Sequence, residues 1–313
     1  MKKIIIIEYF TSKAVIQSKD NKILGEAIKL TNSLIKVFAL NEKIKKVLVV
    51  RNSNIEEYEN IKTKYFKTRN NKSFLKILKL LPEYPVLVIA PETRNISVNF
   101  QKKISNYLPV LHSSLSVNKI FSSKLKTIKH LNKYGIKNTG LLKKTKFKNR
   151  VMVKSNYGTG SEDVKLLKKF KITRSKIIQN FYPGIKGSFM MICYKRKNFV
   201  ISCNKQITEI YKNRFVQTGV IVGGLENERE NIQNIANKIT NSIEGLFGII
   251  GVDIVRFKGE WHVIEVNPRF TSAFIGLYDS IGKDMMKIIT DFYLFRKFKI
   301  RKLELVNKVR VYF

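Results

Sequence analysis

Two apolar segments near the end of the chain carry polar side chains that an ordinary sheet interior would not need. Residues 251–255 and 263–269 are rich in Val and Ile and are separated by a Lys-Gly-Glu turn, so we expect two adjacent antiparallel strands. Glu265 and Asn267 lie two positions apart and therefore project from one face of their strand. Asp253 can reach the same face from the neighbouring strand. The sequence thus predicts three converging oxygen-donor side chains.

Three such side chains in an apolar setting make a poor core and a good site for a hard cation, Mg²⁺ first and Mn²⁺ as an alternative. Arg269 lies two positions after Asn267 and so projects from the same face of the strand. It could bind an anion that also contacts the metal. The alternative interpretation is a polar sheet face turned toward solvent. We favour the metal site, because other parts of the chain supply the remaining elements of a nucleotide site.

The chain is long enough to bury a sizeable core and to divide into two or three units, and no apolar run approaches the ~20 residues of a membrane span. The apolar run at residues 4–7 is only four residues long before Glu8, which favours a buried first strand over a signal peptide. We therefore expect a soluble cytoplasmic protein with no membrane partner. Cys193 and Cys203 fit that compartment as reduced core residues, and as members of one hairpin they could be neighbours.

The net charge would normally suggest a nucleic-acid partner, because 60 Lys and Arg residues against 23 Asp and Glu give +37. The basic residues are spread along the whole chain among abundant Ile and Asn, with no basic tail and no recognition helix. A composition bias explains this distribution better, so we disfavour nucleic acid as a partner. The charge could still speed the capture of anionic substrates such as nucleotides.

The N-terminal third alternates strands with amphipathic helices, which predicts a parallel sheet covered by helices. Glu92 falls just beyond the last of these strands, where open α/β sheets bind ligands. We expect strands at residues 3–9, 46–50 and 86–90, and helices at residues 22–40 and 73–81.

The remainder of the chain changes character and reads as mostly antiparallel. A basic helix at residues 124–133 leads into short strands separated by Gly and Lys. One amphipathic helix, with apolar residues on one face from Ile232 to Leu246, interrupts the later strands. Those strands are expected at residues 188–194, 199–206 and 215–223.

A strand that ends in Lys154 is followed by a Gly-rich loop containing Gly158, Gly160 and Ser161. Such a loop lets backbone N–H groups and a hydroxyl approach the phosphates of a nucleotide closely. The glycines alone would be weak support, since any hairpin can use them, but the lysine before them and the acidic site later make the pattern specific. The loop is not a P-loop, because the spacing lacks GxxxxGK[ST] and no helix is expected after it.

Residues 177–184 are expected to form a strand that runs into a Pro-Gly turn. An apolar and aromatic segment with an amide side chain could hold a flat heterocycle by backbone hydrogen bonds and packing. On this segment alone, an ordinary core strand is the favoured interpretation.

These parts, in this order, resemble the ATP-grasp superfamily of carboxylate–amine ligases, and the resemblance extends from about Lys124 to Asp291. It implies a fold of the α/β and α+β classes, with an N-terminal parallel α/β domain, a small central lid and a larger C-terminal antiparallel domain. ATP would lie between the last two. We therefore expect domains at residues 1–112, 113–182 and 183–313.

The resemblance also implies a role for each motif residue. Lys124 and Lys154 match the two nucleotide-binding lysines, and Arg269 matches the arginine that faces an acyl phosphate, so Arg269 and Lys154 are the expected catalytic residues. The other matches are the phosphate loop at Gly158, Gly160 and Ser161, the adenine-binding linker at Gln179, Asn180, Phe181 and Tyr182, and the Mg²⁺ ligands Asp253, Glu265 and Asn267.

Within the superfamily, the chain resembles most the tyramine–glutamate ligases of methanofuran biosynthesis, and the pyrrolysine-pathway ligases less closely. The narrower resemblance implies that Asn204 and Gln206 lie beside the substrate. Its motifs are Ile-Glu-Tyr at residues 7–9, Ala-Pro-Glu-Thr at 90–93, Ser-Lys-Leu-Lys-Thr at 123–127 and Ser-Cys-Asn-Lys-Gln at 202–206.

The chain departs from the superfamily pattern without losing a phosphate or metal ligand. Amides at Gln179 and Asn180 replace the usual Glu of the linker, which leaves the choice of nucleotide open. The other departures are Ser123 for Asp, Ser155 for Pro and Asp163 for a frequent Gly.

The activity expected from this resemblance is the ATP-dependent formation of an amide from an amino-acid carboxylate, glutamate favoured, and an amine, tyramine favoured, through an acyl phosphate. We expect Glu8 and Glu92 to hold the amine, with the capping of neighbouring helices as an equal alternative. Other carboxylate–amine or peptide ligases, a basic nucleic-acid-binding protein and an ATP-binding protein without turnover are the alternatives. A homodimer is compatible with the resemblance, since dimers are common in that superfamily.

Overall fold

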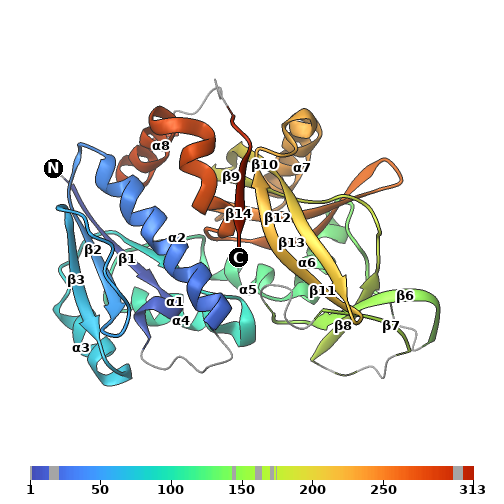
Figure 1. The fold of residues 1–313 in the computed structure, drawn as a ribbon, viewed down its shortest axis with the longest axis horizontal. Coiled ribbons are helices and arrows are strands. Elements are labelled where there is room, and N and C mark those ends of the chain that lie inside the picture. Colours follow the sequence, from blue (N-terminus) through green and yellow to red (C-terminus); the bar gives the residue numbers. More distant parts are fainter. Residues whose placement is uncertain are drawn as a thin grey trace.

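Two halves lie side by side in the molecule, each built on its own sheet (Figure 1). Helices α2 (Asn21–Leu40) and α8 (Leu277–Phe295) pack against each other where the halves meet. One hydrophobic core includes Leu34 from the first half and Phe292 from the second, so the halves share buried surface. The computed structural model describes residues 2–13, 21–142, 146–158, 164–169, 173, 175–298 and 306–313.

The N-terminal sheet is parallel and has the strand order β3-β2-β1-β4-β5. Ile4 and Ile6 face one hydrophobic core while Ile5 and Ile7 face another, so helices cover both sides of the sheet. The expected parallel α/β arrangement is confirmed. The strands are β1 (Lys2–Glu8), β2 (Ile44–Asn52), β3 (Thr63–Thr68), β4 (Val86–Ile89) and β5 (Val110–Leu111), and the helices that follow them include α1 (Tyr9–Ser12), α3 (Asn71–Leu80) and α4 (Ile96–Ser105).

The strand order of this sheet reverses at β1, with β2 and β3 on one side of it and β4 and β5 on the other. Open α/β sheets bind ligands at the carboxyl ends of the strands that flank such a reversal. Glu8 ends β1, Glu92 follows β4, and His112 follows β5. The topology therefore gathers these three side chains at one edge of the sheet.

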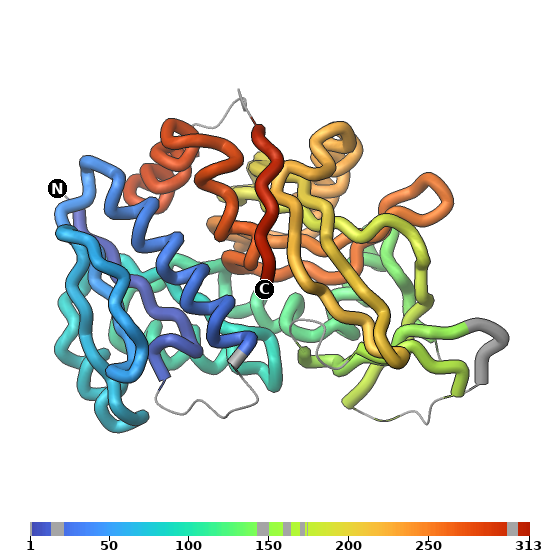
Figure 2. Tube along the Cα trace, viewed as in Figure 1, coloured from blue at the N-terminus to red at the C-terminus, as the bar shows by residue number. Residues whose placement is uncertain are grey.

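The C-terminal sheet is antiparallel and has the order β13-β12-β9-β10-β11-β7-β6-β8, with β14 paired to β11 beside that path (Figure 2). A single pair, Arg214 with Lys165, joins β11 to β7, so β6, β7 and β8 form a peripheral part. The strands are β6 (Lys146–Ser155), β7 (Lys165–Lys169), β8 (Lys176–Asn180), β9 (Lys186–Tyr194), β10 (Lys197–Tyr211), β11 (Arg214–Val222), β12 (Gly248–Phe257), β13 (Glu260–Asn267) and β14 (Val309–Tyr312).

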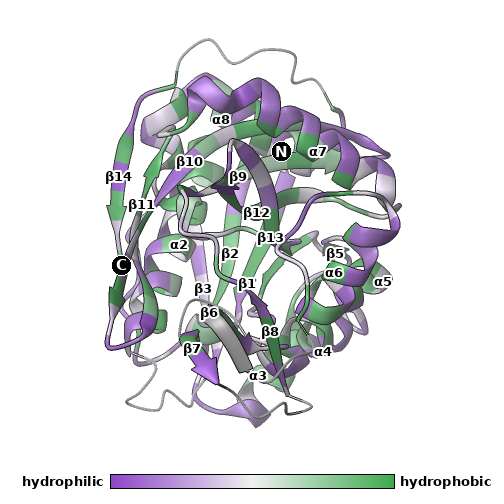
Figure 3. Ribbon diagram, turned by 90° about the vertical axis from the view of Figure 1, so that its right-hand side faces the viewer, coloured by the Kyte–Doolittle hydropathy of each residue, from purple (hydrophilic) through white to green (hydrophobic). Residues whose placement is uncertain are grey.

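Helices cover this sheet and connect it to the first. Helix α7 (Arg229–Ser242) packs on β9 and β10, and α7 and α8 show alternating hydrophilic and hydrophobic bands in Figure 3, as expected of helices that cover a core on one side. Helices α5 (Leu115–Phe121) and α6 (Lys124–Lys133) link the two sheets, and α6 has the expected bounds. None of the described helices is long and apolar enough to cross a membrane.

Some elements differ from the expectations. Strands β3, β5 and β14 were not expected, because they are short edge strands or carry polar sequences. Helix α7 ends at Ser242, yet Leu246 still packs into the same core as Ile232, so the apolar pattern outlasts the helix. The expected combination of a parallel and an antiparallel part is present, while the division into three domains stays a prediction.

The two cysteines are not neighbours across the hairpin, contrary to that suggestion. In the register of β9 and β10, Cys193 lies opposite Asn198 and Cys203 lies opposite Phe189. Both thiols are free and buried, and burial raises the pKa of each to about 12, which fits reduced core residues.

Candidate active site

The strand pair that carries the candidate metal ligands forms in the expected register. β12 and β13 are antiparallel, with Asp253 opposite Glu265 and Gly251 opposite Asn267. Asn267 Nδ2 lies 3.5 Å from Asp253 Oδ2 and donates to it, which turns the amide oxygen of Asn267 away from the carboxylate. A Cβ at position 251 would meet the Thr271 side chain at 2.3 Å, so only glycine fits opposite Asn267. Asp253 and Glu265 therefore lie opposite each other with the Asn267 amide beside Asp253, and their role as metal ligands stays a prediction.

The charges of the two carboxylates are linked. Burial, and then the charge of Glu265, raises the pKa of Asp253 well above its usual range. Burial acts to raise the pKa of Glu265 as well, but Lys124 and Lys154 outweigh it and lower this pKa to about 2. Two buried carboxylates and an amide held this close together need positive charge, and they form a donor set that suits Mg²⁺. Within the described ranges, no group of three or more His, Cys, Asp or Glu side chains forms another metal site.

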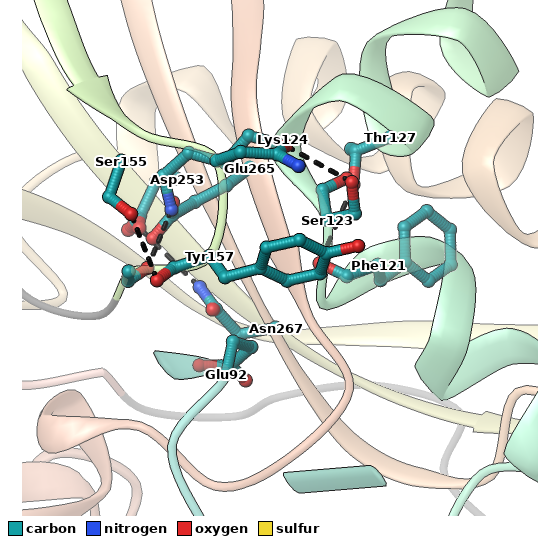
Figure 4. A network of polar contacts seen from close by, with 12 residues as sticks. Glu92, Phe121, Ser123, Lys124, Thr127, Ser155, Tyr157, Asp253, Glu265 and Asn267 are labelled. Carbon is teal, nitrogen blue, oxygen red and sulfur yellow. Dashed lines mark hydrogen bonds and ion pairs between the residues drawn. The ribbon is translucent and has the colours of Figure 1, made fainter. Parts of the chain in front are cut away.

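The first of the two predicted lysines, Lys124, contacts Glu265 from outside the strand pair (Figure 4). Lys124 begins α6, and its Nζ lies 2.6 Å from Glu265 Oε2 and donates to the Gly158 carbonyl at 2.7 Å. Lys154 lies near the end of β6 and is only 3% exposed. Burial and the neighbouring charge of Lys124 lower the pKa of Lys154 to about 8. The site thus places two cations beside two carboxylates, an arrangement suited to a polyphosphate and its metal.

A residue that the sequence did not single out, Asn156, holds these elements together. Its side-chain oxygen accepts from Leu125 N at 2.8 Å and from Ser123 Oγ at 3.1 Å, while its carbonyl accepts from Lys124 N at 3.0 Å. Ser123 also caps α6. Asn156 follows Lys154 by two residues and bonds the backbone and side chains around Lys124. It therefore fixes Lys124 relative to Lys154. An Asn in a loop carries no sequence signal for such a role.

Replacing Asn156 with Ala should lower the free energy of unfolding by about 1–3 kcal/mol, because the partly buried Leu125 N–H and the buried Ser123 hydroxyl lose their acceptor. Chemical denaturation would measure this loss. Asn156→Asp is the matched variant, since it retains an acceptor oxygen at the same place and should lose less. Equal losses in the two variants would contradict the assigned role of the side-chain oxygen.

Part of the expected phosphate loop can be located. The Gly158 carbonyl accepts from Lys124, which brings the start of the loop to the site. Gly160 and Ser161, together with Asp163, lie outside the described residues, so their expected roles stay predictions.

The expected adenine-binding linker, residues 179–182 at the end of β8, supplies aromatic rings and a hydrogen-bond acceptor without a partner among the described residues. Gln179 is buried, and its Nε2 donates to Thr139 Oγ1 at 2.6 Å and to the Gly140 carbonyl at 3.2 Å. Its Oε1 has no hydrogen-bond partner among the described residues. Asn180, the last residue of β8, is half-buried and its side chain approaches Gly140.

The rest of the linker is aromatic. Tyr182 stacks on Phe257, with ring centroids 4.5 Å apart and an angle of 3°, and meets the edge of His262. Lys186 Nζ donates to the Tyr182 carbonyl and lies 5.2 Å from the centroid of the Phe181 ring. Burial lowers the pKa of Lys186 to about 8. Phe257 and Lys186 were missed by the sequence reasoning, because each joins the linker only through tertiary packing.

The two residues expected beside the substrate have different surroundings. Gln206 Nε2 donates to Asp253 Oδ1 at 2.8 Å, so Gln206 orients a candidate metal ligand. Asn204 is fully buried, accepts from Gly223 N at 3.3 Å and donates to Ser188 Oγ at 3.5 Å. The contacts of Asn204 join neighbouring strands of the sheet.

Arg269 lies just beyond β13 and binds Glu92 from the other half of the molecule. Its Nε and Nη2 donate to the two carboxylate oxygens of Glu92 at 2.8 and 2.7 Å, and its Nη1 donates to the Phe270 carbonyl at 3.1 Å. Three of the five guanidinium N–H groups are thus engaged, and the remaining two lie on Nη1 and Nη2. These two N–H groups can still donate hydrogen bonds to an anion.

Glu8 takes the capping alternative that the sequence left open. Its carboxylate accepts from Phe10 N at 3.1 Å and from Thr11 N at 2.6 Å, at the N-terminus of α1. Burial raises the pKa of Glu8, although these two hydrogen bonds and Arg269 oppose the shift. The predicted role of Glu8 in holding an amine is not supported by these contacts and stays a prediction.

Comparison with known proteins agrees with the ATP-grasp resemblance of the sequence. The family model for the ATP-grasp domain matches residues 121–273. The tyramine–L-glutamate ligase of Methanocaldococcus fervens is 32% identical over 61% of this chain and 60% of that enzyme, so this alignment leaves two-fifths of that enzyme uncovered. The corresponding ligase of Methanocaldococcus jannaschii is 29% identical over 83% of this chain and 80% of that enzyme.

Solved structures share the fold along nearly the whole chain. An ATP-grasp superfamily protein of Archaeoglobus fulgidus superposes with a TM-score of 0.75, at 20% identity, over 100% of this chain and 92% of that one. N5-carboxyaminoimidazole ribonucleotide synthetase of Thermotoga maritima gives a TM-score of 0.65, at 17% identity, over 99% of this chain and 80% of that one. The chain therefore has the ATP-grasp fold, and its residues 121–273 match the ATP-grasp domain.

Proposed function

We propose that this protein joins the carboxylate of an amino acid to a primary amine at the expense of ATP. The observation that carries the proposal is the convergence of Lys124 and Lys154 on the Asp253–Glu265 pair, with Arg269 close enough for its pKa to be raised by Glu265. This arrangement can neutralise a polyphosphate on one side and an activated carboxylate on the other.

The chemistry needs positioning and charge neutralisation more than a protein nucleophile. A carboxylate oxygen attacks the γ-phosphorus of ATP, the bond to the β-phosphate oxygen breaks, and ADP leaves. The amine nitrogen then attacks the acyl carbon, the bond from that carbon to the phosphate oxygen breaks, and phosphate leaves with the electron pair and takes up the proton that the amine loses. Lys124 and Lys154 stabilise the transferring phosphoryl group, and the two remaining N–H groups of Arg269 meet the acyl phosphate.

A divalent cation fits the donor set of this site. Asp253, Glu265 and Asn267 would hold Mg²⁺, and Gln206 orients the first of them by its hydrogen bond. When bound, the cation supplies further neutralisation of the phosphate charges. Mn²⁺ has the same preference for carboxylate and amide oxygens and could replace it.

Glutamate and tyramine are the favoured substrates, because two relatives that carry those substrates in their names match 61% and 83% of this chain. On this proposal the protein takes part in methanofuran biosynthesis. The linker residues Gln179, Asn180, Phe181 and Tyr182 would hold the adenine, the rings by packing and Gln179 by its buried amide. Another small-molecule or peptide carboxylate–amine pair is the second candidate, supported by the likeness of fold to an L-amino acid ligase of Bacillus licheniformis (TM-score 0.62, 14% identity, 94% of this chain and 74% of that one).

The experiment that tests the proposal measures ADP release with ATP, Mg²⁺, glutamate and a panel of amines that includes tyramine, with products identified by mass. We expect ADP release that depends on tyramine and a new glutamyl amide of tyramine. ADP release with a different carboxylate or amine would show that the protein is a ligase with other substrates. No amide with any pair, despite ATP binding, would overturn the proposal.

A further inference from the structure

His112 lies at the sheet edge where Glu8 and Glu92 also gather, and the function proposed above gives it no task. It directly follows β5, which pairs with β4 through Leu87 and Leu111. Because the strands are parallel, His112 lies at the same edge as the segment after β4 that carries Glu92. Its imidazole is within the electrostatic range of both Glu92 and Arg269. His112 therefore lies near the Arg269–Glu92 pair.

A buried polar network fixes the orientation of this imidazole. His112 Nδ1 lies 3.1 Å from the Ser113 carbonyl, which also accepts from Gln101 Nε2 at 2.8 Å. Gln101 Oε1 in turn accepts from Asn118 Nδ2 at 2.8 Å, and Asn118 bonds Ser97 on α4. A carbonyl can only accept, so the Nδ1 of His112 carries the hydrogen in this contact. In a neutral ring the other nitrogen, Nε2, is then a hydrogen-bond acceptor.

The ring is neutral at physiological pH. Burial, with a further contribution from Arg269, lowers the pKa of His112 to about 4, although the Ser113 carbonyl and Glu92 oppose the shift. A charged imidazole beside Arg269 would repel a cationic substrate and compete for Glu92. A neutral one offers an acceptor without adding a positive charge.

We propose that His112 Nε2 accepts a hydrogen bond from the nitrogen of the acceptor amine and holds it for attack on the activated carboxylate. The proposal rests on the ligase function proposed above. An amine attacks the acyl carbon from above the plane of the carbonyl, so it must be held beside the activated carboxylate. Arg269, which is expected to face the acyl phosphate, binds Glu92 at the same sheet edge as His112, so an amine held by His112 would lie beside the activated carboxylate. Primary amines are the class of ligand that such an acceptor would recognise.

The experiment compares His112→Asn with His112→Gln. Asn can place its amide nitrogen near the position of Nδ1 and keep the donor to Ser113, but it removes the acceptor at the position of Nε2. Gln can place an amide oxygen near the position of Nε2. His130→Asn is the control, since His130 on α6 bonds Ser242 and has no role in the site.

Two readouts separate the two halves of the reaction. Amide formation as a function of amine concentration reports on the amine site. Trapping of the acyl phosphate by hydroxylamine, in the absence of the natural amine, reports on carboxylate activation alone. For His112→Asn we expect kcat/KM for the amine to fall by roughly tenfold to hundredfold, as for the loss of a hydrogen bond to a charged group, while hydroxamate formation stays at the wild-type level.

The pH dependence gives a further check, because a ring with a pKa of about 4 stays neutral above pH ~5. The ratio of wild-type to His112→Asn activity should therefore be constant from about pH 6 to 9, and His112→Gln should recover most of the loss. An unchanged kcat/KM for the amine, a parallel loss of hydroxamate, or a ratio that titrates near neutral pH would overturn the inference. If the wild-type protein forms no hydroxamate from any carboxylate, the ligase proposal itself fails, which is a distinguishable result.

Discussion

Replacing Glu265 with Gln is expected to lower kcat by roughly 10²–10⁴-fold, because metal-assisted stabilisation of phosphate charge contributes several kcal/mol to such reactions. Glu265 is opposite Asp253 in the strand pair and bonded to Lys124, so it contacts both the candidate cation and a phosphate-binding lysine. The amide of Gln retains an oxygen that can accept from Lys124 and nearly the same volume. The loss should therefore appear in turnover and in the concentration of Mg²⁺ required, with the fold preserved.

The measurement is ADP release over a range of Mg²⁺ concentrations, together with thermal unfolding of each variant. Glu260→Gln is the matched control, since Glu260 begins the same strand but forms an exposed ion pair with Lys137. Its removal should leave both stability and turnover nearly unchanged, because an exposed ion pair contributes little. Wild-type turnover in Glu265→Gln would show that this carboxylate is not a metal ligand.

The strand pair that carries Glu265 could be predicted because its signal is local. Alternating apolar residues, a turn and two polar positions of equal parity fix both the strands and the face on which the carboxylates lie. The same holds for β1, whose four consecutive Ile residues are buried on both faces of the parallel sheet. The Lys-containing strand before the glycine loop was likewise recognisable from neighbours in the sequence.

Contacts between distant segments could not be predicted in the same way. Glu92 and Arg269 are 177 residues apart, and their bidentate pairing depends on how the two sheets pack. Asn156 is close in sequence to Lys154, but its partners Ser123 and Leu125 belong to another helix. Sequence reasoning assigned Arg269 an anionic ligand and did not foresee that a carboxylate of the same chain would bind it.

His112 illustrates a second reason for missed residues. Its neutral state depends on burial and on Arg269, and its tautomer depends on a carbonyl held by Gln101. No sequence motif or residue spacing indicates these features, because they depend on elements that come together only in the folded chain. A histidine at the end of an unexpected two-residue strand therefore gave no signal.

Removing one partner of the buried Arg269–Glu92 pair should destabilise the protein strongly. Arg269→Met is expected to lower the free energy of unfolding by about 3–5 kcal/mol, because the carboxylate of Glu92, with a side-chain exposure of only 5%, loses its guanidinium. Glu92→Met should cost a similar amount, since a guanidinium that is 12% exposed then loses its carboxylate. Chemical denaturation of both single variants would measure these losses.

The double variant distinguishes the structural contribution of the pair from its chemical one. Buried ion pairs can be replaced by apolar side chains of similar size with little loss, so Glu92→Met combined with Arg269→Met should recover much of the stability lost in either single variant. Turnover should not recover with it, because the two N–H groups of Arg269 that remain available for an acyl phosphate are absent. Recovery of both stability and turnover would reduce Arg269 to a packing contact between the halves. Additive losses of stability would instead show that the two side chains act independently, contrary to their bidentate geometry.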